Sequence, residues 1–373
     1  MACVRAPCFA ACPALVCACG ASSPAAPSSS ESAAATATLS PVAASADWPA
    51  SSPEAEGLDA ARLGDLVRRL RRGDFGRTAS VLIVRNGRLA LEEYFNGWSA
   101  DRVHTMQSVS KSVTSLLVGL AIQSGAMRGD DPIARFFPQY QPFANTDDRK
   151  LAITVRDLLT MRSGLDWSED TYPGSPLQRL NDCRCDWLRF VLDWPMREPP
   201  GSRWEYVSGG TIALGGAVGA ATGLRLAQFA DAQLFGSLGV TGAYWVGGLP
   251  NGLPHAGGGL YLRPRDMAKI GALMLDDGNW RGRQILSPRW IEESARRVTT
   301  GVRNWAGHSF DYGYFWWLID DRGSDVITAA GAQGQFIFVS SRTRMIVAVT
   351  SDDEARWTAP VEFLYSHILP SAQ

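Results

Sequence analysis

A serine and a lysine lie three residues apart in the segment HTMQSVSKSVTSLLVGL (104–120). An apolar helical repeat begins at Ser108 and predicts a helix from about 108 to 124, which places the Lys111 amine beside the Ser108 hydroxyl. The positive end of the helix dipole and burial both disfavour an ammonium group, so a neutral Lys111 can accept the serine proton. The alternative is that Ser108 is an ordinary helix cap.

Lysine is rare in this chain, which favours a catalytic role for the pair Ser108 and Lys111. Of 36 basic residues only Lys111, Lys150 and Lys269 are lysine, and arginine stands everywhere else. Arginine keeps its proton in proteins and cannot act as a base. A Ser-x-x-Lys pattern also arises by chance, so its meaning depends on the segments around it.

Strand patterns at both ends of the chain indicate how this helix is positioned. Hairpins are predicted in 80–95, around the turn Asn86-Gly87, and in 334–351, with another strand in 312–320. Helices are predicted at 52–73 and 357–369. The sequence therefore predicts an α+β fold, in which an antiparallel sheet of about five strands from both termini is flanked by helices and interrupted by a mostly helical insertion of roughly 200 residues.

Composition and a glycine-rich stretch exclude two classes of function. The 36 basic and 37 acidic residues leave a formal net charge of −1, so no basic excess argues for nucleic acid. The stretch GGTIALGGAVGAATG (209–223) matches neither dinucleotide nor Walker spacing. We interpret it as a small-residue helix that packs closely on a neighbour.

The first residues resemble an export signal. Residues 1–19 carry one charge and an apolar run too short to span a bilayer, and VCAC (16–19) resembles a lipoprotein cleavage box that would leave a lipidated Cys19. Ordinary signal-peptidase cleavage is the alternative. Residues 20–47, rich in Ala, Ser, Pro and Thr, predict a disordered tether, and 48–373 is the predicted folded domain.

Cysteines cluster in the predicted signal. Five of the seven precede residue 20, and the folded part keeps only Cys183 and Cys185. This pair lacks a second cluster and is a poor metal site, so free thiols are favoured over a local disulfide.

Four segments follow one another in an order typical of one enzyme family: MQSVSKSVTSLLVGLAIQSGAM, ITVRDLLTMRSGLDWSE (153–169), PPGSRWEYVSGGTIALGGAVGAATG (199–223) and GGGLYLRPRDMAKIGALMLDDGNWRGRQIL (257–286). Together they resemble the serine β-lactamase-like hydrolases, which include class C β-lactamases, DD-peptidases, esterases and 6-aminohexanoate-dimer hydrolases. The resemblance covers about residues 50–370 and implies the β-lactamase/transpeptidase-like fold.

The resemblance assigns roles to individual residues. Ser108 matches the nucleophile and Lys111 its partner, while Tyr206 in EYVS matches the tyrosine that acts with the lysine as general base and then protonates the leaving group. Ser208 stands where the second motif usually has asparagine, and it is a candidate substrate contact. In the loop 166–182, Tyr172 is a further candidate.

The third motif of the family, Lys-Thr-Gly, falls at Ala329-Ala330-Gly331. Its lysine and hydroxyl, which would hold the carboxylate of a penicillin or peptide, are absent. The strand still offers Gly331 and a backbone amide near Ala332 as a second oxyanion donor, beside the amide of Ser108.

The sequence therefore predicts an exported serine hydrolase, periplasmic or membrane-anchored, that cleaves a small-molecule ester, amide or peptide through an acyl-enzyme. No metal, organic cofactor or nucleic acid is implied. The alternatives are a β-lactamase or DD-carboxypeptidase acting on cell-wall peptides, and a penicillin-recognising sensor that does not turn over.

Overall fold

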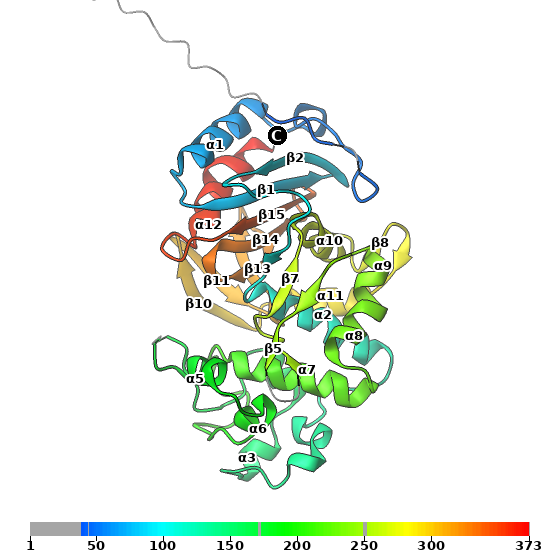
Figure 1. Ribbon diagram of the computed structural model, residues 1–373, viewed down its shortest axis with the longest axis vertical. Coiled ribbons are helices and arrows are strands. Elements are labelled where there is room, and N and C mark those ends of the chain that lie inside the picture. Colours follow the sequence, from blue (N-terminus) through cyan, green and yellow to red (C-terminus); the bar gives the residue numbers. More distant parts are fainter. Residues whose placement is uncertain (1–38, 44, 171–172, 249–251, 373) are drawn as a thin grey trace, which may run out of the picture. The chain divides into compact units, whose positions relative to one another are not determined.

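The sheet at the centre of the molecule is antiparallel and has eight strands in the order β10-β11-β12-β13-β14-β15-β1-β2 (Figure 1). The computed structural model describes residues 39–43, 45–170, 173–248 and 252–372. Within these residues, the strands of the main sheet are β1 (Thr78–Arg85), β2 (Arg88–Tyr94), β10 (Thr299–Trp305), β11 (His308–Tyr312), β12 (Trp317–Asp321), β13 (Ser324–Gly331), β14 (Gln335–Ser340) and β15 (Met345–Ser351).

Both predicted hairpins are confirmed, and they pair with each other through β15 and β1, next to the edge strand β2. Asn86 (φ 51°) and Gly87 (φ 76°) make the turn between β1 and β2, as left-handed residues do in tight hairpins. Strand β1 also pairs with β15, with Ile83 opposite Val347. The predicted sheet built from both ends of the chain is thus confirmed.

The predicted number of about five strands is wrong, because β10 and β11 were not predicted and β13 was expected only through the resemblance, as the strand that carries the third motif. Strand β10 has the sequence TTGVRNW, and most of its residues are partly or fully exposed at the sheet edge. Such a strand lacks the apolar alternation of a half-buried strand and is stabilised by pairing with β11. The predicted strand 312–320 is displaced, since β12 begins at Trp317.

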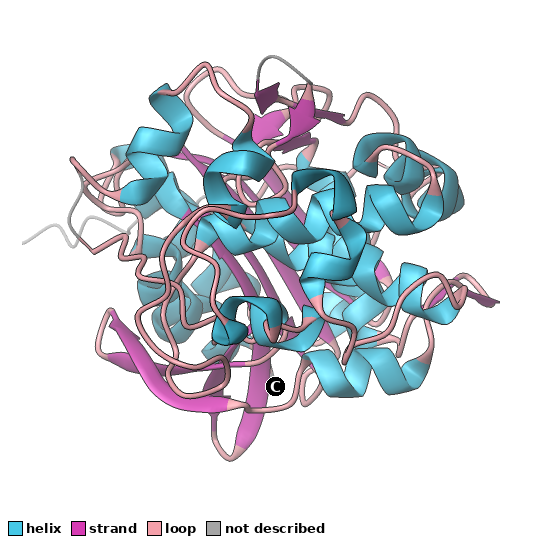
Figure 2. Ribbon diagram, turned by 90° about the horizontal axis from the view of Figure 1, so that it is seen from below, coloured by secondary structure: helices cyan, strands magenta, loops and turns pink. Residues whose placement is uncertain are grey.

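The segment between β2 and β10 is mostly helical, as predicted. Its helices are α2 (Val109–Gln123), α3 (Asp148–Leu151), α4 (Val155–Leu159), α5 (Pro176–Asp182), α6 (Trp187–Leu192), α7 (Ser208–Thr222), α8 (Leu226–Ala230), α9 (Gly236–Leu238), α10 (Pro264–Leu275) and α11 (Pro288–Ser294). Its short strands are β3 (His104–Thr105), β4 (Tyr244–Trp245), β5 (Gly247–Gly248), β6 (Leu253–Pro254), β7 (Leu260–Leu262), β8 (Asn279–Trp280) and β9 (Arg283–Gln284). Helices lie on both sides of the sheet (Figure 2).

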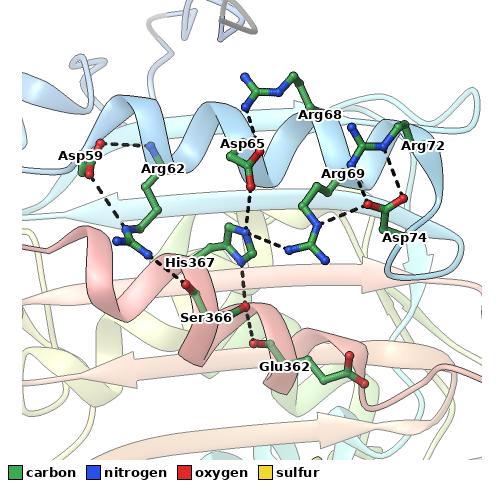
Figure 3. Close-up of polar contacts among 10 residues, drawn as sticks. All are labelled: Asp59, Arg62, Asp65, Arg68, Arg69, Arg72, Asp74, Glu362, Ser366 and His367. Atoms are coloured by element: carbon green, nitrogen blue, oxygen red, sulfur yellow. Dashed lines mark hydrogen bonds and ion pairs between the residues drawn. The ribbon is translucent and has the colours of Figure 1, made fainter. Parts of the chain in front are cut away.

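Helix α1 (Ala60–Arg72) and the C-terminal helices pack together beside β1 (Figure 1). The latter are α12 (Ala359–Phe363), a π-helical turn (Leu364–Ile368) and α13 (Leu369–Ser371). Figure 3 shows the polar contacts between them, in which His367 Nε2 lies 3.2 Å from Asp65 Oδ2 and 3.4 Å from Arg69 Nη1. His367 thus joins the C-terminal helices to α1, while the neighbouring Ser366 hydroxyl donates to the Glu362 carbonyl at 2.7 Å within the C-terminal helices.

Helix α7 is the predicted small-residue helix, and its glycines are needed for close packing. A Cβ atom on Gly209 would lie 2.7 Å from the Trp167 ring, and one on Gly216 would lie 2.7 Å from Leu188 Cδ2. Both contacts are shorter than carbon atoms tolerate, so a larger residue would push the helix away from its neighbours. This prediction is confirmed.

Cys183 and Cys185 form a disulfide, so the preference for free thiols is wrong. Cys183 ends α5 in an extended conformation (φ −80°, ψ 136°), which brings the two Cα atoms to 5.2 Å, within the normal range for a bonded pair.

The described chain packs against the domain from Leu39 onward, before the predicted start at 48. The Ser40 amide donates to Glu93 at 2.8 Å, and Asp47 pairs with the buried Lys269 at 2.8 Å. Trp48 is buried edge-to-face against Trp280. The predicted signal peptide, Cys19 and the first part of the predicted tether lie outside the described residues.

Candidate active site

Ser108 directly precedes α2, and its side chain makes no capping hydrogen bond to the helix. The Lys111 ammonium donates to Ser108 Oγ at 2.9 Å. The residue before it, Gln107, has a left-handed backbone (φ 45°), which costs conformational energy and is concentrated at functional sites in proteins. The hydroxyl is therefore held toward the lysine, and the interpretation of Ser108 as a simple helix cap is wrong.

Lys111 is almost fully buried, with 2% of its surface exposed. Besides Ser108, it donates to the Gly257 carbonyl at 2.7 Å. Burial lowers its pKa to about 8, and the Glu169 carboxylate opposes this by raising it. With that pKa about one lysine in ten is neutral at pH 7, against about one in several thousand for a lysine in water.

Tyr206 packs against the lysine, whose Nζ is 4.8 Å from the centre of the phenol ring. Its ring also stacks on Trp317 at 5.9 Å. Burial raises the pKa of Tyr206 well above its usual value, and a hydrogen bond with Ser108 opposes this. Tyr206 is therefore a phenol near neutral pH, able to pass a proton on but costly to ionise.

The end of strand β13 closes the site from the side of the sheet. A Cβ atom on Gly331 would lie 2.6 Å from the Met106 carbonyl and 3.0 Å from the Ser108 amide nitrogen, so only glycine allows this approach. Ala330, Gly331 and Ala332 line the same cavity as Ser108. The AAG segment at the end of β13 therefore lies directly beside Ser108.

A cavity of about 310 Å³ opens beside Ser108. Its aromatic walls are Tyr206, Trp305, Trp317 and Trp357. Its charged groups are Glu169, Asp170, Arg303 and Glu354, of which Arg303 and Asp170 form an ion pair at 2.9 Å. The walls combine an apolar surface with few charges that are free to meet a ligand, as is common in small-molecule sites.

Sequence reasoning missed Glu169. Its carboxylate accepts hydrogen bonds from the Ser208 amide (2.6 Å), the Ser208 hydroxyl (2.9 Å) and the Trp167 indole (2.6 Å). Nothing in the sequence DWSED distinguishes Glu169 from Asp166 or Asp170, because the difference lies in tertiary contacts. Arg303, Trp305 and Trp357 were missed for the same reason, since they come from segments far along the chain.

The other predicted binding residues have different positions. Ser208 is 2% exposed, its hydroxyl donates to Glu169, and it is absent from the described lining of the cavity. A direct substrate contact by Ser208 is thus disfavoured.

Tyr172 lies outside the described residues. Gly331 and Ala332 are brought to Ser108, as are Lys111 and Tyr206.

Comparison with known proteins agrees with this geometry. The beta-lactamase family model matches residues 65–363. The chain is 27% identical over 310 residues to a 6-aminohexanoate-dimer hydrolase from Paenarthrobacter ureafaciens, covering 78% of this chain and 76% of the relative. It is 32% identical over 183 residues to Esterase EstB from Burkholderia gladioli, covering 47% and 46% of the two chains.

The fold is shared with solved structures at lower identity. The octameric penicillin-binding protein homologue from Pyrococcus abyssi superposes with a TM-score of 0.64 at 18% identity, covering 84% of this chain and 78% of that one. The family match spans most of the folded chain, and the expected β-lactamase/transpeptidase-like fold is confirmed. The chain belongs to the beta-lactamase family and is a serine hydrolase.

Proposed function

We propose that this enzyme cleaves an ester or amide bond of a small molecule through an acyl-enzyme on Ser108. The observation that carries the proposal is the buried hydrogen bond between Lys111 Nζ and Ser108 Oγ, at 2.9 Å. A buried lysine beside a serine hydroxyl is an effective base for that hydroxyl.

In the proposed reaction, neutral Lys111 takes the proton of Ser108 as Oγ attacks the carbonyl carbon. The oxyanion is stabilised by the backbone N–H groups of Ser108 and Ala332. Among the described residues, the Ser108 N–H has no hydrogen-bond acceptor, so it is available. The proton then passes from Lys111 through Tyr206 to the leaving oxygen or nitrogen, the acyl–oxygen or acyl–nitrogen bond breaks, and water releases the acyl group with the same base.

The cavity favours uncharged, apolar acyl groups over carboxylate-bearing peptides. Ala329 and Ala330 replace the lysine and hydroxyl that would bind a carboxylate. Arg303, a basic group in the cavity wall, is already paired with Asp170. The tryptophan rings instead offer apolar surface. The names of the relatives, a 6-aminohexanoate-dimer hydrolase and an esterase, support a hydrolase of small ester or amide substrates.

A comparison of substrates tests this assignment. We expect steady hydrolysis of p-nitrophenyl butyrate by residues 39–373, with kcat/KM at least about 100-fold above that for a chromogenic cephalosporin, since the lost charge-assisted contacts are worth roughly 3 kcal/mol. Rapid hydrolysis of the cephalosporin would favour the β-lactamase alternative. A burst of product without steady turnover would favour the sensor.

We also propose that the protein is exported and attached to a membrane through a lipid on Cys19, with the following Ala/Ser/Pro-rich residues as the tether. The apolar leader and the VCAC box support this. Metabolic labelling with a palmitate analogue should mark the full-length protein and be lost in Cys19→Ala. Labelling that persists in this variant would rule out Cys19 as the attachment site.

A further inference from the structure

Glu169 lines the cavity beside Ser108 and joins its loop to the start of helix α7. We propose that Glu169 is a positioning residue, which holds the first turn of α7, and with it Tyr206, in register with Ser108 and Lys111. This inference deepens the proposed function and rests on it for its catalytic consequence. It assigns a role to a carboxylate that touches neither the nucleophile nor the reacting bond in the reaction described above.

The hydrogen bonds of Glu169 are concentrated on one turn of backbone. Ser208 is the first residue of α7, and both its amide and its hydroxyl donate to the carboxylate, at 2.6 and 2.9 Å. A free amide at a helix start needs an acceptor, and a negative charge there is favoured by the helix dipole. Val207 precedes the helix without a side-chain cap, so Glu169 supplies the cap from a distant segment.

The loop end of this connection is also fixed. The Trp167 indole donates to the same carboxylate at 2.6 Å, and its ring is fully buried. A Cβ atom on Gly209 would lie only 2.7 Å from this ring. The loop and the helix are therefore already packed as closely as they can be. Tyr206 is two residues before Ser208. A shift of this turn would therefore change the distance from the phenol to Ser108.

The charge of Glu169 has a second effect on the pair. All three of its hydrogen-bond donors are neutral groups, and no ion pair of Glu169 is found among the described residues. The uncompensated charge raises the pKa of Lys111 and that of Tyr206. It therefore stabilises the ammonium formed when Lys111 takes the serine proton, and it keeps Tyr206 as a phenol.

Glu169→Gln tests both effects, because glutamine keeps the size of the side chain but loses the charge and one acceptor. Lys111 is one of only three lysines, so its titration can be followed by NMR on protein labelled with [ε-13C]lysine. We expect its midpoint to move to lower pH in Glu169→Gln and kcat on p-nitrophenyl butyrate to fall about tenfold. Asp166→Asn is the matched control, since Asp166 lies in the same loop but pairs with Arg197 outside the cavity. It should change neither quantity.

Ser208→Ala separates positioning from charge. It removes the hydroxyl donor but keeps the amide and the charge of Glu169, so we expect a smaller fall in kcat and an unchanged Lys111 midpoint. An unchanged Lys111 midpoint together with kcat within twofold of wild type in folded Glu169→Gln would overturn the inference, even if ester hydrolysis is confirmed. If the wild type hydrolyses no ester while the midpoint shifts as expected, the proposed function fails and the electrostatic part of the inference stands.

Discussion

Ser108→Ala is expected to lower kcat/KM for p-nitrophenyl esters by at least about 10⁴-fold, since loss of the nucleophile removes the covalent route and leaves only binding and oxyanion stabilisation. Labelling of the protein by a fluorophosphonate should disappear in the same variant. Ser108 makes no capping bond to α2, so alanine is not expected to lower the melting temperature. Initial rates and gel fluorescence measure the two effects.

The control is a serine of the same helix region that lies away from the cavity. Ser124 follows the last residue of α2, and its hydroxyl donates to the Ala121 carbonyl at 2.9 Å. Ser124→Ala should keep both turnover and labelling. Wild-type turnover in folded Ser108→Ala would refute Ser108 as nucleophile, whatever the labelling result.

The activity is expected to rise with pH through about 8, the pKa to which burial lowers Lys111. The active form is the neutral amine, so kcat/KM should fall about tenfold for each unit below this pKa and reach a plateau above it. Between pH 7 and pH 9 the neutral fraction grows by about tenfold. Tyr206 stays protonated across this range, because burial raises its pKa. A flat profile from pH 6 to pH 9 would contradict Lys111 as the base.

Lys111→Arg extends the same prediction. A guanidinium cannot give up its proton near neutral pH, so we expect kcat/KM to fall at least about 10³-fold at every pH up to 9, and the rise near pH 8 to vanish. Lys150→Arg is the matched control, since Lys150 is also buried but donates to the Ala144 carbonyl outside the cavity. It should keep the wild-type profile. Substantial activity in a folded Lys111→Arg variant would show that another group takes the serine proton.

The departure at the third motif is the basis of the proposed preference against carboxylate-bearing substrates. The backbone of β13 keeps its place against Ser108, as the close approach of Gly331 requires. The side chains that would hold a carboxylate are replaced by Ala329 and Ala330. On the proposed function, the part of the motif that supports acyl transfer is retained, while the part that would select the substrate differs.

The sequence by itself determined the elements whose signals are local. The Ser108 helix, the Asn86-Gly87 hairpin and the glycine-rich helix follow from apolar periodicity and turn residues, which act over a few neighbours. The candidate pair Ser108 and Lys111 came from helical spacing, while the role of Tyr206 came from the resemblance of its segment to the family. The sequence did not predict strand β10, because this edge strand lacks a local apolar pattern and is stabilised by pairing with β11.

Only the tertiary structure decided how the site is completed. Glu169 is one of several acidic residues in its loop, and its contacts with Ser208 and Trp167 alone distinguish it. Arg303 and Trp357 line the same cavity as Ser108, although about 200 residues of sequence or more separate them from it. No local sequence pattern extends over such a separation. The lowered pKa of Lys111 likewise arises from burial. The sequence suggests a buried lysine at the start of this helix, but only the packing of the folded chain removes its side chain from water.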